Sequence, residues 1–114
     1  KIGCTTPVMQ AFLGIDHPCA GGVHAVRVFR REAELDHGDF LHVGFETEIA
    51  VMIGRDLPPR GAPYTADDLR GAVSAVCAAI EVVDDRWIDY RRVDTPSLIA
   101  DDFFNDASVL GAWQ

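Results

Sequence analysis

The longest regular pattern in the sequence is an alternation of side chains between Val43 and Ile53. Side chains two residues apart on a strand point to the same side, so this alternation predicts a β-strand. Its apolar face, which has one polar member, comprises Val43, Phe45, Thr47, Ile49, Val51 and Ile53. That face is predicted to be buried. The opposite face carries Gly44, Glu46, Glu48, Ala50 and Met52.

Two short helices are predicted from their first residues. Thr5 or Thr6 can cap a helix that starts at Pro7, because proline suits the first helical position. Gly14 can end that helix. A second helix is predicted over Pro96–Ala100 by the same rule.

A longer helix is predicted to begin after Thr65. Thr65 and Asp68 have the spacing of a capping box. Apolar residues then recur at helical spacing, which extends the predicted helix to about Ala79. The β-branched segment Ile80–Val83 is predicted to follow it directly as a strand.

The remaining segments are predicted to be short strands and loops. Lys1–Thr5 is expected to be the end of a short strand, and further strands are expected over Val23–Phe29 and from Ser108 towards Trp113. Loops or surface excursions are expected over residues 15–22, 30–38, 57–64 and 101–106. This order of elements indicates an α+β protein in which short strands dominate.

Composition narrows the class of partner. A chain of 114 residues forms one domain at most, and its formal charge of −8 argues against a nucleic-acid partner. It has no basic patch for an anionic membrane, no signal-peptide pattern, and no apolar run of the ~18 residues that a spanning helix needs. Three cysteines without a C-x-x-C pair favour a reducing, cytoplasmic setting.

Acidic residues are the first candidates for chemistry. Glu46 and Glu48 project from one face of the predicted central strand, and Glu81 interrupts the apolar run from Ala78 to Val83. Three carboxylates with water or substrate oxygens suit Mg²⁺ or Mn²⁺. From spacing alone, a solvated strand face is the better interpretation, because such faces are common.

Other candidates have weaker support from the residues alone. Lys1 could serve as an acid–base group or hold an anionic substrate, or it could be an ordinary surface lysine. Cys19 lies in a loop with Asp16 and His17, where a nucleophile is conceivable. The alternative for Cys19 is a small packed side chain.

Four blocks of the sequence match motifs of one known protein family. The opening KIGCTTPVMQ, with LGIDHP after it, is similar to the motif K-[IV]-G-x-[ST]-x-x-x-M-Q. The second and third blocks are ETEIA with GRDL, and AIEVVD. The fourth is formed by Ala100-Asp101 and Val109-Leu110-Gly111, which match the ends of a segment A-D-N-A-S…V-L-G. In these four blocks the chain resembles the 2-keto-4-pentenoate hydratases of the fumarylacetoacetate hydrolase superfamily.

The resemblance implies a mixed β-sandwich roll with short peripheral helices, of which residues 1–114 would be the central part of a larger catalytic domain. It implies that Glu46, Glu48 and Glu81 ligate Mg²⁺ or Mn²⁺, and that Lys1 moves protons or binds a carboxylate. The substrate would be a small 2-oxo acid whose enolate the metal stabilises. Asp16, Cys19 and Asp101 are the candidate substrate-binding residues. The protein is expected to form a homo-oligomer.

Two departures from the family pattern leave the reaction open. Cys19 stands where the hydratases commonly carry aspartate, and residues 102–106 stand where they carry N-A-S-S-G. A hydratase-type lyase is the leading hypothesis. A hydrolase or decarboxylase of the same superfamily that breaks a carbon–carbon bond is the first alternative. A non-catalytic module is the second.

Overall fold

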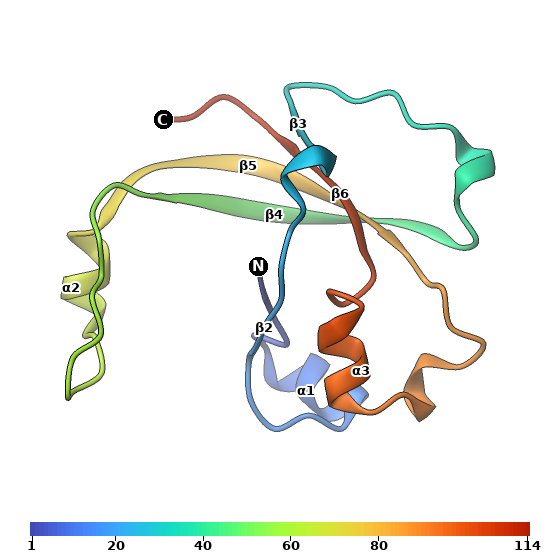
Figure 1. Ribbon diagram of the computed structural model, residues 1–114, viewed down its shortest axis with the longest axis horizontal. Helices are drawn as coiled ribbons and strands as arrows, with labels where there is room; N and C mark the ends of the chain where they lie inside the picture. The colour runs from blue at the N-terminus through green and yellow to red at the C-terminus, as the bar shows by residue number, and fades with distance from the viewer.

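A four-stranded mixed sheet organises the molecule, and the computed structural model describes all 114 residues (Figure 1). The strand order is β3-β6-β5-β4. The strands span Val28–Arg30 (β3), Val43–Ile53 (β4), Val73–Asp84 (β5) and Asn105–Leu110 (β6). β4 and β6 are antiparallel to β5, whereas β3 is parallel to β6. The prediction of an α+β protein is confirmed, while the named β-sandwich roll stays a prediction.

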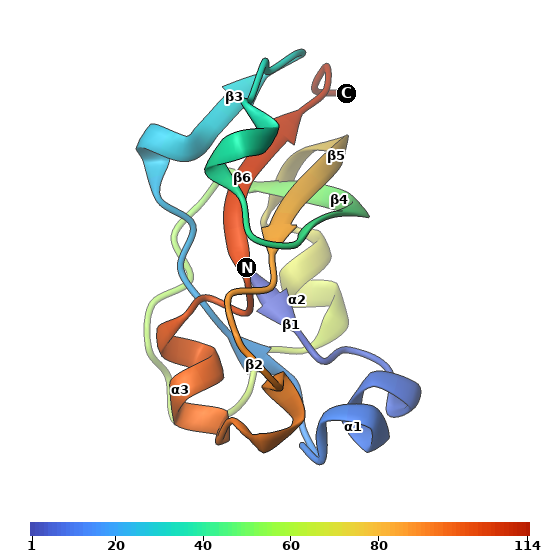
Figure 2. The ribbon, with the colours of Figure 1, turned by 90° about the vertical axis from the view of Figure 1, so that its right-hand side faces the viewer.

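A second layer lies against one end of this sheet. It contains the two-stranded antiparallel sheet β1 (Ile2–Gly3) and β2 (Cys19–Ala20), with α1 (Pro7–Leu13) and α3 (Thr95–Ala100) beside it (Figures 1 and 2). Its centre is a cluster of buried side chains: Cys4, Ile15, Cys19, Leu98 and Phe103. This cluster joins segments from both ends of the chain, so it fixes where residues near Lys1 meet the sheet.

Helix ends follow the capping signals in the sequence. The Thr6 side chain accepts a hydrogen bond from the Met9 amide, and Gly14 ends α1 with a left-handed φ of 67°. Both hydrogen bonds of a capping box form at α2 (Ala66–Arg70), between Thr65 and Asp68. These predicted helix starts are confirmed, as is the helix before Ala100, which begins at Thr95.

The helix predicted to run to Ala79 is wrong. α2 ends at Arg70, and the residues from Val73 onward form the twelve-residue strand β5. Their apolar spacing suits either a helix or a strand, but β4 offers a partner along almost their whole length, from Val73 opposite Ile53 to Asp84 opposite Val43. Pairing with that strand satisfies the backbone groups, so tertiary context overrides the local pattern.

Two further strand predictions are correct only in part. Of Val23–Phe29, only Val28 and Phe29 lie in a strand, and Ala25–Arg27 form a turn of 3-10 helix. The last strand begins at Asn105, ahead of the predicted Ser108, and ends at Leu110. Single 3-10 turns also occur at His37–Asp39 and Tyr90–Arg92.

The predicted burial of the apolar face of β4 is wrong for this chain. Phe45 and Ile49 are 73% and 74% exposed, and Val51 and Ile53 are each at least half exposed. On the same face of the neighbouring strand, Ile80 is also exposed. The alternation correctly predicts the strand, but no other part of the chain covers its apolar side.

No helix has the length and apolar character needed to cross a membrane.

Candidate metal centre

Strand register brings three glutamates together on one face of the sheet. Glu46 of β4 lies directly opposite Glu81 of β5, and cross-strand partners point to the same side. Glu48, two residues further along β4, also shares that face and lies opposite the small residue Ala79. One carboxylate oxygen of each glutamate lies within 4.8 Å of the other two. The structure therefore brings together the three acids that the sequence singled out.

The cluster carries an excess of negative charge, which shows in the pKa of Glu46. Desolvation raises the pKa of Glu46, and the nearby Glu81 and Glu48 carboxylates raise it further. The Lys1 ammonium acts in the opposite direction on the Glu46 pKa. With the three acids and Lys1 ionised, two negative charges remain without a partner, which is the charge that a divalent cation neutralises.

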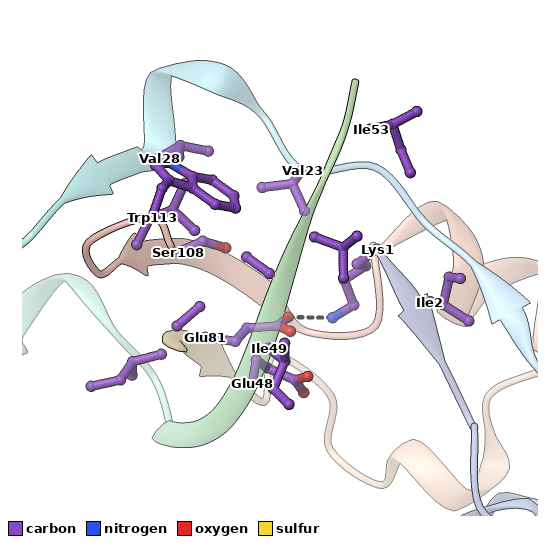
Figure 3. A pocket seen from close by; sticks show the side chains of 15 residues that line it. Lys1, Ile2, Val23, Val28, Glu48, Ile49, Ile53, Glu81, Ser108 and Trp113 are labelled. Atoms are coloured by element: carbon purple, nitrogen blue, oxygen red, sulfur yellow. Dashed lines mark hydrogen bonds and ion pairs between the residues drawn. The ribbon is translucent and has the colours of Figure 1, made fainter. Parts of the chain in front are cut away.

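Lys1 reaches this face from the strand β1 side. Its Nζ donates to Glu81 Oε1 (Figure 3). It also donates to the main-chain oxygen of Phe103 at 3.1 Å. The two side chains are 14% (Lys1) and 9% (Glu81) exposed, so the ion pair is largely shielded from water. Such shielding strengthens the pair and fixes the ammonium beside the acids.

The Glu81 carboxylate is held from a second side by strand β6. Asn105 Nδ2 donates to the same oxygen, Oε1, at 2.9 Å. Because Lys1 and Asn105 both donate to Oε1, neither occupies Oε2, the second oxygen of Glu81. Glu81 is thereby oriented and keeps an oxygen to offer a ligand.

A cavity of about 600 Å³ adjoins Glu48 and Glu81 (Figure 3). Lys1, Glu48 and Glu81 are its only charged lining residues. The rest of the wall is mostly apolar and includes Ile2, Val23, Val28, Ile53, Leu110 and Trp113. A site with few polar groups at one end and an apolar remainder is typical of small-molecule binding.

Relatives were found by sequence comparison over nearly the whole chain, although no family model matches it. A 2-keto-4-pentenoate hydratase of Burkholderia vietnamiensis (strain G4 / LMG 22486) is 36% identical over 115 residues, covering 98% of this chain and 42% of the relative. A 4-oxalocrotonate decarboxylase of a Pseudomonas species is 29% identical over 113 residues, covering 99% of this chain and 43% of the relative. The chain belongs to the family of 2-keto-4-pentenoate hydratases and 4-oxalocrotonate decarboxylases.

The fold agrees with this hydratase and decarboxylase family. A solved 4-oxalocrotonate decarboxylase from Pseudomonas putida G7, complexed with magnesium and adipate, superimposes with a TM-score of 0.83 at 24% sequence identity. It is matched over 96% of this chain and 41% of its own. The same enzyme complexed with calcium and acetate gives a TM-score of 0.79. The chain thus spans about two fifths of the length of the family members it matches.

The three weaker candidates from the sequence lie apart from the cavity wall. Asp16 is 99% exposed and pairs with His17 Nδ1 at 2.7 Å, which lowers the pKa of its carboxyl. Cys19 is buried in the cluster around Leu98, as a packed side chain. Asp101 accepts hydrogen bonds from Arg86, from Trp87 Nε1 and from the Phe104 amide, so it holds the segment after α3.

Several residues at the site of this family member escaped the sequence analysis. Asn105 and the Phe103 carbonyl contact Glu81 and Lys1, and Trp113 lines the cavity. Their signal is weak because each depends on contacts between segments about 24 to 102 residues apart. A polar amide inside an acidic and aromatic run was the only local hint for Asn105.

Proposed function

We propose that the protein is a divalent-metal-dependent lyase of the hydratase type, and that this chain carries its metal centre. The observation that carries the proposal is the cluster of Glu46, Glu48 and Glu81 within 4.8 Å, with the Lys1 ammonium paired to one of them. The names of the related proteins support the class of reaction.

The donor set fits a hard divalent cation. Oxygen ligands of an octahedral Mg²⁺ lie at about 2.0–2.1 Å from the ion, and therefore about 3–4 Å from one another. Carboxylate oxygens within 4.8 Å need only small side-chain rotations to reach that spacing. Three carboxylates leave coordination positions for substrate oxygens, and they do not suit a structural zinc site. Mg²⁺ is the ion of choice in this proposal, with Mn²⁺ as its close substitute, and the magnesium complex of the decarboxylase supports it.

A bound ion would polarise the 2-oxo and carboxylate oxygens of a 2-oxo acid. The chain's own residues then set the geometry and move protons. Glu81, oriented by Asn105, holds the Lys1 ammonium at the cavity wall. From there Lys1 Nζ can deliver a proton to a substrate carbon or hold the substrate carboxylate.

The cavity favours a hydratase substrate over a dicarboxylic one. A diacid such as 4-oxalocrotonate has a second carboxylate at its far end, and no arginine or histidine lines the cavity to meet it. Burying an unpaired carboxylate against Val28, Leu110 and Trp113 would be unfavourable. We therefore infer a substrate with one carboxylate and an apolar alkenyl tail, that is, a 2-hydroxydienoic acid.

A decarboxylase is the second candidate, because the solved structures that this chain superimposes on are 4-oxalocrotonate decarboxylases. Product analysis separates the two reactions. Hydration of a vinylpyruvate-type acid without release of CO₂ supports the hydratase proposal, whereas faster CO₂ release from oxalocrotonate or oxaloacetate contradicts it. Cleavage of an acylpyruvate would identify a hydrolase instead.

Metal binding tests the centre itself. Mn²⁺ titration, followed by calorimetry and water-proton relaxation, should show one site that weakens at least about tenfold in Glu46→Gln and Glu81→Gln. Glu34→Gln, which changes an exposed glutamate outside the cluster, is the matched control and should bind as the parent does. Equal Mn²⁺ affinity in all four proteins would refute the site. Metal binding without turnover of any 2-oxo acid would indicate a non-catalytic module.

A further inference from the structure

Three consecutive residues after α3 adopt a left-handed backbone. Asp102, Phe103 and Phe104 have φ angles of 52°, 48° and 66°. This region is unfavourable for residues with a side chain, and most of all for bulky ones. The turn persists because the Phe103 side chain is buried in the cluster around Leu98, and because the Phe103 amide donates to the Leu98 carbonyl at 2.9 Å.

The turn aims a main-chain oxygen at Lys1. The Phe103 carbonyl accepts a hydrogen bond from Lys1 Nζ at 3.1 Å, in addition to the contact of the same Nζ with Glu81. A regular helical or extended path through these residues would turn this carbonyl elsewhere. Backbone strain of this kind, when it recurs at a site, indicates a geometric role.

The side chain of Asp102, the first residue of the turn, binds the segment that contains Gly22 and His24. Asp102 Oδ1 accepts a hydrogen bond from the Gly22 amide at 2.6 Å, and Asp102 Oδ2 lies 3.6 Å from His24 Nε2. A Cβ placed on Gly21 or Gly22 would lie 3.3 Å from Oδ1, so this close approach suits glycine at both positions.

That glycine segment holds the backbone of Lys1. The Lys1 main-chain nitrogen donates to the Gly21 carbonyl at 2.7 Å, and the Gly21 amide donates to the Lys1 carbonyl at 3.0 Å. The left-handed turn therefore restrains Lys1 both at its side-chain ammonium and at its main chain. It holds the Nζ directly through the Phe103 carbonyl, and the main chain indirectly through Asp102 and the two glycines.

We infer that Asp102 is a positioning residue that sets the place of the Lys1 ammonium at the metal centre. Its carboxylate ties the Gly21-Gly22 segment to the left-handed turn, and both contact Lys1. The kinetic part of this inference rests on the proposed function, whereas the structural part does not. Asp102 does not line the cavity, so it acts through Lys1.

Lys1 offers a direct readout, because it is the only lysine of the chain. In protein labelled with ¹³C-lysine, its ¹³Cε–¹Hε signal should move towards the position of a solvated lysine in Asp102→Ala. Asp102→Asn keeps an oxygen that can accept the Gly22 hydrogen bond, so its signal should stay near that of the parent. Gly22→Ala perturbs the same contact from the other side and should move the signal as Asp102→Ala does.

Turnover supplies the second readout. Loss of a hydrogen bond to a charged group typically lowers an equilibrium or rate constant that depends on it by a factor of roughly 10–100. We therefore expect kcat of Asp102→Ala to fall by that factor with KM within about threefold, and Asp102→Asn to recover most of it. Asp106→Ala is the matched control, since this acid of the same segment pairs with Arg27 and makes no contact with Lys1.

The outcomes are separable. An unchanged Lys1 signal in folded Asp102→Ala overturns the inference, and so does an Asp102→Asn variant as perturbed as Asp102→Ala, or a shift of equal size in Asp106→Ala. If the parent turns over no 2-oxo acid, the proposed function fails, but the Lys1 signal still decides the positioning role.

Discussion

Replacing Glu46 by glutamine should stabilise the metal-free protein and weaken metal binding at the same time. The substitution preserves the shape of the side chain and removes one charge from the cluster. Two unit charges 4.8 Å apart repel by about 0.9 kcal/mol in water and by about 3.5 kcal/mol at an effective dielectric constant of 20. Glu46 is exposed, and Lys1 offsets part of the repulsion, so the net gain in unfolding free energy should be about 0.5–1 kcal/mol.

The gain should depend on pH in a defined direction. Because the pKa of Glu46 is raised in the folded protein, its ionised form disfavours folding at neutral pH. That penalty disappears as the pH falls below the ordinary glutamate pKa, where the group is protonated in both states. The melting temperature of Glu46→Gln should therefore exceed that of the parent by about 2–5 °C at pH 7–8, and by nothing near pH 3.5.

Saturation with Mn²⁺ should reverse the order of the melting temperatures. At a free ion concentration of 100 times the parent's Kd, binding adds about 2.7 kcal/mol to the stability of the parent. A variant that binds tenfold more weakly gains only about 1.4 kcal/mol under the same conditions. Differential scanning calorimetry with EDTA and then with Mn²⁺ measures both states, and Glu34→Gln controls for the change in net charge. A destabilised metal-free Glu46→Gln, or an order that Mn²⁺ leaves unchanged, would refute the reasoning.

Three further predictions concern the scaffold. Thr65→Ala removes the cap of α2 and should weaken that helix by about 1 kcal/mol, seen as faster exchange of the Leu69 amide, whereas unchanged exchange would contradict the capping role. Hydrogen bonds from Thr65 and Arg60 hold the pKa of Asp68 well below its usual value. The ionised Asp68 carboxylate should therefore stabilise α2 above about pH 4, and this stabilisation should be lost as the pH falls through the folded-state pKa. A free energy of Leu69 amide exchange that does not change with pH would argue against this role. Leu98→Ala empties the buried centre of the small layer and should cost about 2–5 kcal/mol in urea denaturation, and a cost below about 1 kcal/mol would show that this cluster is not a core.

The sequence predicted what depends on neighbours in the chain. The alternation from Val43 to Ile53 gives the bounds of β4, and the Thr65 and Asp68 pair gives the start of α2. It failed where two patterns coincide, as in the segment from Val73 to Asp84, because apolar residues there suit both a helix and a strand. Only the presence of an eleven-residue partner strand decides between them.

For the candidate site too, the sequence predicted the residues that have a local signal and missed those that depend on tertiary contacts. The acids Glu46 and Glu48 follow from the period of one strand, and Glu81 stood out as a charge in an apolar run. Lys1 was a weak candidate from the residues alone, since a single lysine has no pattern, and only the family resemblance gave it a role. The supports around them, Asn105 and the left-handed turn at Phe103, depend on tertiary contacts that no local signal describes.

The position of the acids within the sheet divides the candidate metal centre into two halves that differ in mobility. Glu81 stands on an inner strand with a paired neighbour on either side, whereas Glu46 and Glu48 stand on β4, which is paired along one side only. Peptide groups along an unpaired edge exchange and flex more readily than those inside a sheet. A bound ion would therefore have one rigidly held ligand and two more mobile ones, and its binding should reduce the motions of β4 far more than those of β5.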